Sequence, residues 1–296
     1  MRRLATDIGE GPVVASIEAS DSRWADSLGR FATFATWAVL VLLAVSLVAR
    51  WQAVHYAPWS NMYEFTVAFA AAITLFYAVF ERVYARDEDA LVPQGPSPER
   101  SRLGPRPTAG GASLPPARVL GAVVLPVVLT MLIIAAAFFP SDIQPLVPAL
   151  QNSDLLAIHV ATMILAYGAL SVSFAAGALY LVQGPRNRFS RLPRAALLDD
   201  VAYRSVMVGF PLLAAGIALG AYWANSAWGR YWAWDPKETS ALVTWLIYGI
   251  YLHMRGLRNW SGTRSAAVLV AGFAAVIFTY FVVNLWVSGL HSYAGV

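Results

Sequence analysis

Cysteine is absent from this sequence, lysine occurs once, and charged residues of either sign are sparse. Because it has no cysteine, the chain cannot form a disulfide, a thiolate metal site or a thiol nucleophile, so any thiol chemistry must belong to a partner. Charged residues are 13% and hydrophobic residues 58% of the 296 residues, whereas soluble domains have about 25% and about 45–50%. This balance excludes an ordinary soluble globule and predicts several membrane spans.

Seven apolar segments are each long enough to cross a bilayer as a helix. They cover residues 31–49, 62–80, 119–139, 155–182, 205–223, 239–256 and 266–289. The first follows a long polar stretch, unlike the apolar core of a cleaved signal peptide, so we treat it as a permanent span. The sequence therefore predicts an all-α, polytopic membrane helix bundle of about seven transmembrane helices, with a tail over residues 1–30 and a membrane domain over residues 31–296.

The basic residues indicate the direction of the chain across the membrane. The N-terminal tail and every second connection hold 18 of the 21 basic residues, while the connections on the other side hold only Arg50, Arg230 and Lys237. Basic connections stay in the cytoplasm, so we predict a cytoplasmic N-terminus and an extracytoplasmic C-terminus, and no nucleic-acid partner. Residues 86–117 are rich in proline, glycine and charge, and are predicted to form a flexible cytoplasmic loop.

Four histidines are the candidate ligands: His55, His159, His253 and His291. His55 lies in the first outer loop, His159 about 7–8 Å below the outer end of the fourth span, and His291 after the seventh span. His253 lies about 21 Å along the sixth span, in the inner half of the membrane. Ionisable residues in membranes are costly and usually functional, so these depths suggest one molecule handled at two levels. The alternative for each is an interfacial or helix-capping histidine.

The outer loop over residues 223–239 concentrates aromatic residues around the only lysine. It holds four of the 11 tryptophans, Trp223, Trp228, Trp232 and Trp234. An interfacial belt would spread such residues over many helix ends, so the concentration indicates a binding surface. The rings offer stacking area, while Arg230 and Lys237 could meet carboxylates. An iron porphyrin held by two imidazoles fits this surface, and a quinone would also suit the rings.

Asp235, Pro236 and Glu238 also have a structural explanation. They match the N-cap, first-turn proline and third-position glutamate of a capping box that opens the sixth span. We therefore expect Asp235 and Glu238 mainly to hold the aromatic loop in position.

The segment WGRYWAWDPKET, from Trp228 to Thr239, resembles the WWD signature WGxxWxWDxKET of heme-handling proteins of cytochrome c assembly. The closest pattern is that of the CcsA family, also called ResC, of the System II pathway; the CcmC and CcmF families share the WWD loop but tend to lack the KET continuation. Three more segments are similar to that family: IHVATMILAYGAL around His159, WLIYGIYLHMR around His253 and NLWVSGLHSYAG around His291. The segment from His55 is similar to the family's GHxPxSNxYE, with Val54 where the family usually has glycine.

The resemblance implies a protein that handles heme b and presents it, outside the cytoplasmic membrane, for attachment to apocytochrome c. It implies that His159 and His291 are axial ligands of an outer heme, and that His253 serves an inner heme site completed by a ResB-type partner, also called CcsB. His55 is expected near the outer site. The loop residues expected to contact heme are Trp228, Gly229, Tyr231, Trp232, Trp234, Asp235, Lys237 and Glu238.

On this interpretation the chain is a subunit of a cytochrome c heme lyase and supplies no catalytic residue of its own, since the reacting thiols belong to a Cys-X-X-Cys-His segment of the acceptor. The resemblance also implies thioredoxin-like thiol reductants as partners of the pathway. Two alternatives remain at this point: a secondary transporter of a small solute with aromatic gates, and a heme-binding scaffold that only assembles other subunits.

Overall fold

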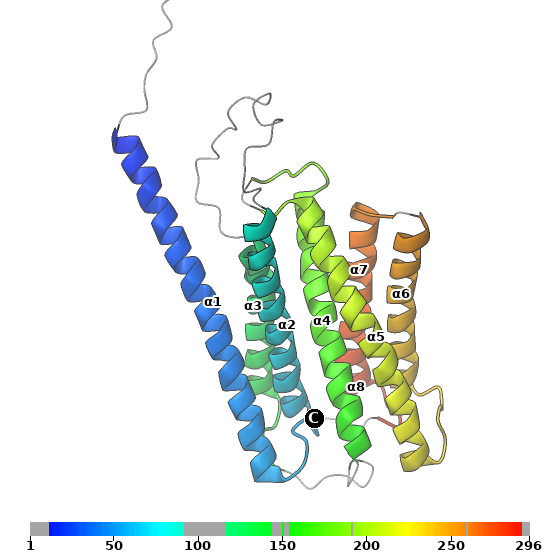
Figure 1. Ribbon diagram of the computed structural model, residues 1–296. Coiled ribbons are helices and arrows are strands. Elements are labelled where there is room, and N and C mark those ends of the chain that lie inside the picture. Colours follow the sequence, from blue (N-terminus) through cyan, green and yellow to red (C-terminus); the bar gives the residue numbers. More distant parts are fainter. Residues whose placement is uncertain are drawn as a thin grey trace, which may run out of the picture.

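The computed structural model describes residues 12–91, 116–143, 150, 154–190, 192–258 and 260–291. These residues contain no β-strand, and nearly all are helical. The helices are α1 (Pro12–Val54), α2 (Met62–Leu91), α3 (Pro116–Phe138), α4 (Asp154–Gln183), α5 (Ala195–Trp228), α6 (Pro236–Arg258), α7 (Thr263–Ile277), a π-helical turn η2 (Phe278–Val282) and α8 (Val283–Trp286). Figure 1 shows the long helices side by side in alternating directions, so the predicted all-α bundle is confirmed.

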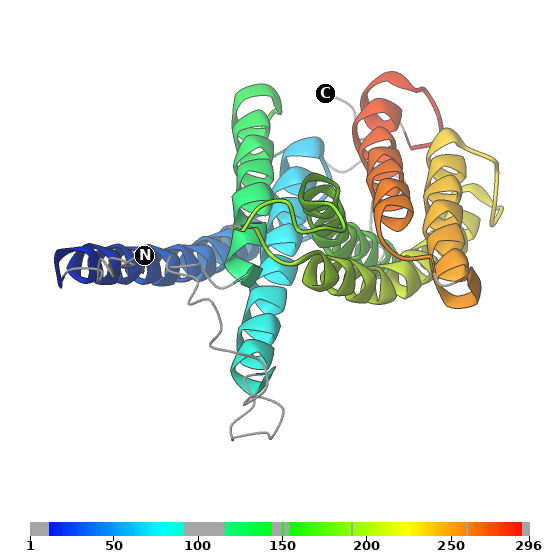
Figure 2. The same ribbon diagram turned by 90° about the horizontal axis from the view of Figure 1, so that it is seen from above.

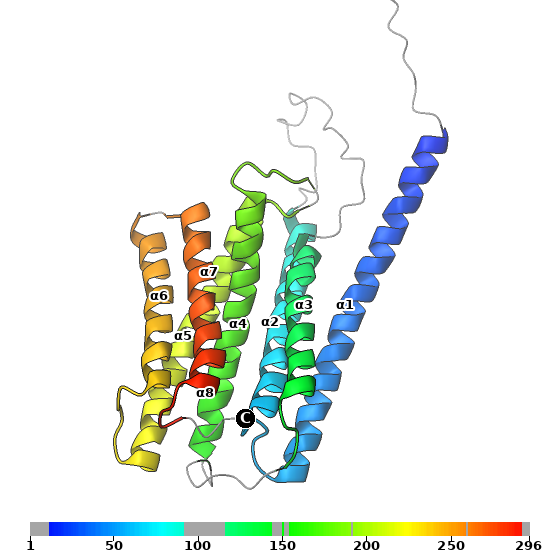
Figure 3. The same ribbon diagram turned by 180° about the vertical axis from the view of Figure 1, so that it is seen from behind.

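Six helical stretches within the described residues are long and apolar enough to cross a membrane. They are Ser27–Val54, Met62–Tyr84, Arg118–Phe138, Asp154–Gln183, Ala195–Trp228 and Thr263–Trp286. The last stretch joins α7, η2 and α8 into one continuous rod, which Figure 3 shows from behind. The chain is therefore a multi-pass membrane protein.

Helix α6 is the seventh long helix, and its weaker apolar character has a structural cause. Its 23 residues extend about 34 Å, enough to span a bilayer core of about 30 Å. One face carries Thr244, Tyr248 and Tyr251, which are 0–2% exposed and point into the bundle. The opposite face is apolar and exposed, with Val243 and Ile250 on it. Because the polar residues lie inside, α6 can be amphipathic and still lie beside α5 and α7.

Helix α1 is peripheral. Only 11% of its apolar stretch is buried in the protein, and Figure 2 shows it extending away from the other helices at its N-terminal part. It begins at Pro12, so part of the predicted tail over residues 1–30 is helical. The predicted loop over residues 86–117 lies mostly outside the described residues, although α2 continues through Leu91.

Ion pairs join the helices near both ends of the bundle. Arg255 of α6 makes two hydrogen bonds to Asp199 of α5, at 2.8 and 2.6 Å, and its guanidinium lies 4.5 Å from the centre of the Tyr203 ring. At the opposite end Arg50 of α1 pairs with the buried Glu64 of α2 at 2.8 Å. Bidentate arginine–carboxylate pairs fix orientation as well as distance, so these contacts set the register of neighbouring helices.

The arginines described in the connections and helix ends gather at one end of the bundle, called here the arginine-rich end. They are Arg82, Arg118, Arg186, Arg188, Arg194, Arg204, Arg255, Arg258 and Arg264. Arg50, Arg230 and Lys237 lie toward the other end, where α5 ends and α6 begins. Within the described residues, these arginines of the connections that the sequence assigned to one side thus lie together.

Candidate functional site

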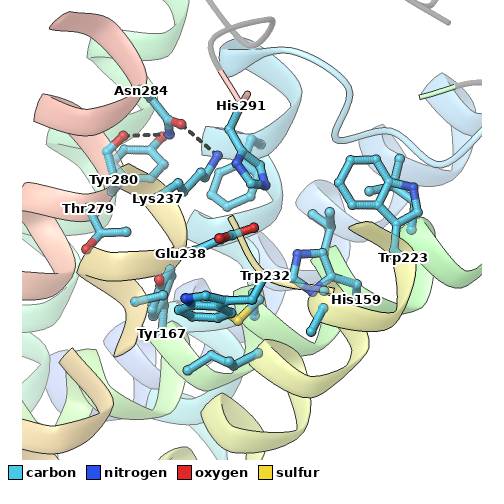
Figure 4. Close-up of a pocket in the computed structure, with 18 residues that line it drawn as sticks. His159, Tyr167, Trp223, Trp232, Lys237, Glu238, Thr279, Tyr280, Asn284 and His291 are labelled. Carbon is cyan, nitrogen blue, oxygen red and sulfur yellow. Dashed lines mark hydrogen bonds between the residues drawn. The ribbon is translucent and has the colours of Figure 1, made fainter. Parts of the chain in front are cut away.

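A pocket is lined by residues near the start of α4, the end of α5 and the start of α6, so it lies toward the end of the bundle opposite the arginine-rich end. Figure 4 shows its lining side chains. The space within the pocket is about 840 Å³, a volume that includes open solvent at its mouth. Its lining comes from α2, α4, α5, α6, η2, α8 and the turn after α8, and most of it is apolar or aromatic. Besides two tyrosines and the tryptophans, the polar lining residues are His159, Lys237, Glu238, Thr279, Asn284 and His291.

His159 enters the pocket from α4 with its ring held against α5. Its Nδ1 atom lies 2.7 Å from the carbonyl oxygen of Gly216. Since a carbonyl oxygen can only accept a hydrogen bond, Nδ1 carries the proton, and the lone pair of the neutral imidazole is on Nε2. This arrangement is the one that a metal-binding histidine uses when its second nitrogen is the ligand.

His291 reaches the same pocket from the turn after α8. Its Nδ1 atom lies 2.7 Å from the Oδ2 atom of Asp235, a carboxyl group that is 6% exposed. The edge of the Trp228 ring meets the imidazole, with ring centres 4.9 Å apart and planes at 81°. The Asp235 carboxylate accepts a hydrogen bond from the Nδ1–H group, so the neutral imidazole has its lone pair on Nε2, as in the carboxylate–histidine–metal arrangement.

Asp235 connects the start of α6 to the turn that carries His291. Its Oδ2 atom accepts the backbone N–H of Lys237 at 3.1 Å, and its Oδ1 atom accepts the N–H of Leu290 at 2.6 Å. Glu238 completes the predicted capping box, because its Oε2 atom accepts the backbone N–H of Asp235 at 3.2 Å and that of Ala233 at 2.9 Å. Burial alone would raise the pKa of the Asp235 carboxyl, but the hydrogen bonds from His291, Leu290 and Lys237 outweigh it and lower that pKa below its usual value.

Two glycines make room for these contacts. A Cβ atom at Gly220 of α5 would lie 2.5 Å from the Cε1 atom of His159. A Cβ atom at Gly289 would lie 2.5 Å from the Oδ1 atom of Asp235 and 3.1 Å from Pro236. Both histidine rings therefore depend on close backbone approaches that only glycine allows.

Lys237 extends along the pocket wall toward α8. Its Nζ atom donates a hydrogen bond to the Oδ1 atom of Asn284 at 2.7 Å, and the Nδ2 atom of Asn284 donates to the backbone oxygen of Tyr280 at 2.7 Å. The Tyr280 hydroxyl in turn shares a hydrogen bond with Thr66 of α2. A polar chain thus joins α6, the end of the α7–α8 rod and α2 on one side of the pocket.

The tryptophan loop divides its rings between the pocket and the surface. Trp232 lines the pocket, while Trp228 contacts His291 and meets Trp223 edge-on, with ring centres 4.8 Å apart. Trp234 is 69% exposed and has a φ of +57°, a left-handed conformation that is uncommon for a residue with a side chain. The backbone reverses first at Gly229, whose φ of +73° ends α5. Tyr231, like Trp234, is on the surface.

His55 is not among the described residues that line the pocket. It is exposed at the end of α1, with a φ of +61°, and its N–H bonds to the carbonyl oxygen of Trp51 at 2.8 Å. The sequence around His55 also departs from the family pattern. Two residues separate His55 from Pro58, whereas the pattern GHxPxSNxYE has one residue between its histidine and its proline. The rest of that segment supports α2: the Oε2 atom of Glu64 accepts the N–H and hydroxyl of Ser60 at 2.9 and 2.8 Å.

His253 lies on the exposed outer face of α6, far from the pocket along the helix axis. It is 16 residues after Lys237, or about 24 Å at 1.5 Å per residue. His253 and the pocket therefore lie at different levels of the bundle, and their depths in a membrane stay a prediction. The side chain of His253 is exposed, and the other three histidines of the sequence lie toward the opposite end of the bundle.

Some pocket residues were not among the predicted site residues. Phe65, Tyr167, Thr279, Tyr280 and Asn284 all line the pocket. Asn284 opens the segment NLWVSGLHSYAG, so its place in that motif was the available signal. The others lie on apolar helix faces, where sequence does not distinguish a pocket wall from a packed core.

The chain was compared with known proteins. Residues 110–291 match the family model described as cytochrome C assembly protein. The chain is 36% identical over 261 residues to the cytochrome c biogenesis protein CcsA of Chlamydomonas reinhardtii, covering 86% of this chain and 65% of that relative. This chain belongs to the CcsA family. The CcsA proteins of Mesostigma viride and of Synechococcus elongatus are each 33% identical to it, over 85% of this chain and 82% and 83% of theirs.

The comparisons cover the parts of this CcsA-family chain that build the pocket. The matched region from residue 110 to 291 includes α3 to α8 and ends at His291. It therefore contains both pocket histidines, the tryptophan loop and His253. The resemblance inferred from the WWD signature is confirmed at the level of the family.

Proposed function

We propose that this CcsA-family protein binds heme between His159 and His291 and presents it on the extracytoplasmic face for thioether attachment to apocytochrome c. The observation that carries the proposal is the pair of imidazoles in one aromatic pocket, each with Nδ1 engaged so that Nε2 has the lone pair. Bis-imidazole ligation suits the two free axial positions of a porphyrin iron.

The two imidazoles of the pocket suit a metal that is already bound in a macrocycle better than they suit a bare metal ion. Among the described residues no group of three or more histidine or acidic side chains gathers as a metal-ion site. Two imidazoles alone are too few for a typical protein zinc or calcium site. They are sufficient for iron whose other ligands come from a porphyrin, and the apolar and aromatic lining suits the faces of such a ring.

The chain's own contribution is to bind and orient its substrate. The heme supplies the vinyl groups, and the acceptor's Cys-X-X-Cys-His segment supplies the two thiols, which agrees with a chain that has no cysteine. The Gly216 carbonyl orients the imidazole of His159, and Asp235 orients that of His291. Trp223 and Trp232 line the pocket beside them. Holding one reactant in a fixed position in this way lowers the entropy cost of the encounter with the second. Thioredoxin-like reductants would keep the acceptor thiols reduced.

His253 is proposed to serve a second heme site together with a ResB-type partner. Its ring lies on the outer face of α6 toward the arginine-rich end, between the exposed Ile250 and Leu257. An imidazole in that position can share a heme only with a side chain of another protein. The partner would thus dock along this face of α6 and supply the opposing ligand.

The heme lyase role predicts that pocket aromatics are needed for maturation and not only for assembly. Cells without their own maturation system would express this chain, a ResB-type partner and a reporter apocytochrome c, and covalent heme on the denatured reporter would be measured. Trp232→Ala is expected to remove most of that heme, while Trp24→Ala, on the exposed surface of α1, is expected to preserve it. Normal maturation in Trp232→Ala would instead favour the scaffold alternative.

The proposed sidedness places the arginine-rich end in the cytoplasm and the pocket outside the cytoplasmic membrane. Because the natural chain has no cysteine, Tyr231→Cys and Arg188→Cys each introduce a single thiol, at exposed positions of opposite ends. A membrane-impermeant maleimide is expected to label Tyr231→Cys in right-side-out vesicles and Arg188→Cys only after permeabilisation. The reverse pattern would contradict the orientation.

A further inference from the structure

Lys237 stands out among the residues that line the pocket. Of the described lining residues it is the only lysine or arginine. It is also the only lysine of the sequence. Its side chain is partly buried, and its polar contact within the described part of the chain is the neutral amide oxygen of Asn284.

The acidic side chains near Lys237 are engaged elsewhere. The carboxylate of Asp235 accepts hydrogen bonds from His291, Leu290 and the backbone of Lys237. The Oε2 atom of Glu238 accepts two backbone N–H groups of the tryptophan loop. Within the described residues the ammonium group of Lys237 therefore forms no ion pair. An ammonium has three N–H donors, and in a partly enclosed apolar pocket its charge is costly without an anion.

The π-helical turn sets the position of the partner of Lys237. In η2 the N–H of Val283 bonds to the carbonyl oxygen of Phe278, five residues earlier, and the Tyr280 carbonyl receives the side chain of Asn284 instead. Figure 4 shows Lys237, Asn284 and Tyr280 together on one side of the pocket and Trp223 on the opposite side. The pocket is thus polar and cationic on the α8 side and aromatic on the other.

We propose that Lys237 is a carboxylate-binding residue that selects iron porphyrins with free propionate groups and turns their carboxylate edge toward α8. This inference rests on the proposed function, because it concerns the same pocket. The propionates of protoporphyrin lie on one edge of the ring and the vinyl groups away from that edge. An ion pair at Lys237 therefore directs the vinyl groups to the side of the pocket away from α8, and the two histidines alone could not distinguish the edges of the ring.

The test compares two probes that differ only in charge at that edge, iron protoporphyrin IX and its dimethyl ester. Each is titrated into the full chain purified with its partner and depleted of heme, and the bis-imidazole absorption spectrum reports binding. Lys237→Met removes the ammonium group and keeps an extended side chain. Arg230→Met is the matched control, because it removes a cation of the same loop that is exposed and outside the described pocket lining.

The wild-type protein is expected to bind the diacid at least about 10-fold more tightly than the ester, a factor that one charge-assisted contact can supply. Lys237→Met should bind the diacid only as well as the ester, whereas Arg230→Met should keep the preference. Equal affinities of the wild-type protein for the diacid and the ester would overturn the inference. This outcome is measured on the wild-type protein alone, so it does not depend on whether a variant folds. A preference retained in Lys237→Met, or lost equally in Arg230→Met, would also overturn it. Failure of the wild-type protein to give a bis-imidazole spectrum with either probe would contradict the proposed function itself.

Discussion

Replacing Asp235 by asparagine is expected to lower the affinity of the outer site for heme by about 10-fold to 100-fold, the usual effect of losing a carboxylate behind a metal-binding histidine. Asparagine is as good an N-cap as aspartate, so the start of α6 should remain in place. The anionic acceptor for the Nδ1 proton of His291 is lost, and with it the fixed orientation and basicity of the ring. Heme titration of the purified protein with its partner measures the change.

Glu238→Gln is the matched control for this variant. Its side-chain oxygen can still accept the backbone N–H groups of Ala233 and Asp235, and within the described residues these are the hydrogen bonds that the Glu238 carboxylate accepts. It should therefore bind heme more nearly like the wild-type protein. An affinity of Asp235→Asn equal to that of wild type would show that the carboxylate serves only as a helix cap.

Acid should have the same effect as the Asp235→Asn substitution, but only well below neutral pH. The folded protein lowers the pKa of Asp235 relative to its usual value, so the carboxylate state is favoured in the folded state. A carboxyl group with a lowered pKa contributes its stabilisation above its unfolded pKa of about 4 and loses it as the pH falls through the lower, folded value. The contact with His291 is therefore expected to persist throughout the neutral range.

The largest spectroscopic change is expected from replacing His159 or His291 by glycine. Either substitution removes one imidazole nitrogen, so heme in the pocket should change from a six-coordinate, low-spin spectrum to a five-coordinate, high-spin spectrum. Glycine leaves the volume of the ring vacant, so imidazole added to the buffer should restore the low-spin spectrum in both variants. The absorption spectrum with and without imidazole is the measurement.

His55→Gly separates the two histidines of the pocket from the one that lies outside it. His55 already has a positive φ, which glycine adopts without strain, and its side chain is exposed. This variant is expected to keep the wild-type spectrum. All variants are compared in a His253→Gly background, so that the proposed second heme does not contribute to the spectrum. Loss of the low-spin spectrum in His55→Gly, or its retention in both His159→Gly and His291→Gly, would contradict the assignment of ligands.

Local patterns in the sequence predicted much of this structure. Apolar segments of sufficient length predicted the membrane helices, because backbone groups in a membrane have to be satisfied within a helix. The spacing of Asp235, Pro236 and Glu238 predicted the capping box, since all of its hydrogen bonds are made within a few residues.

Local patterns could not predict contacts between segments that are far apart in the sequence. Asp235 and His291 are 56 residues apart, and His159 and Gly216 are 57 apart, so neither pairing leaves a periodic signal in one sequence. The sequence therefore assigned Asp235 a positioning role for the loop but gave no indication that it also holds a histidine.

The tryptophan loop shows a second reason why the sequence could not predict the whole site. Which of its rings line the pocket depends on the backbone conformations at Gly229 and Trp234, both with positive φ. Trp234 adopts a conformation that residue preferences disfavour, and the surrounding contacts determine it. The sequence thus predicted a binding role for the loop but could not separate Trp232, in the pocket, from Trp234, on the surface.

The most direct test of the central claim is a density map of this CcsA-family protein, purified with its ResB-type partner and loaded with heme. We predict a porphyrin in the pocket of α4, α5, α6 and α8, with its iron bonded to the Nε2 atoms of His159 and His291. Iron ligated by other residues, or heme bound only outside this pocket, would contradict the proposed function.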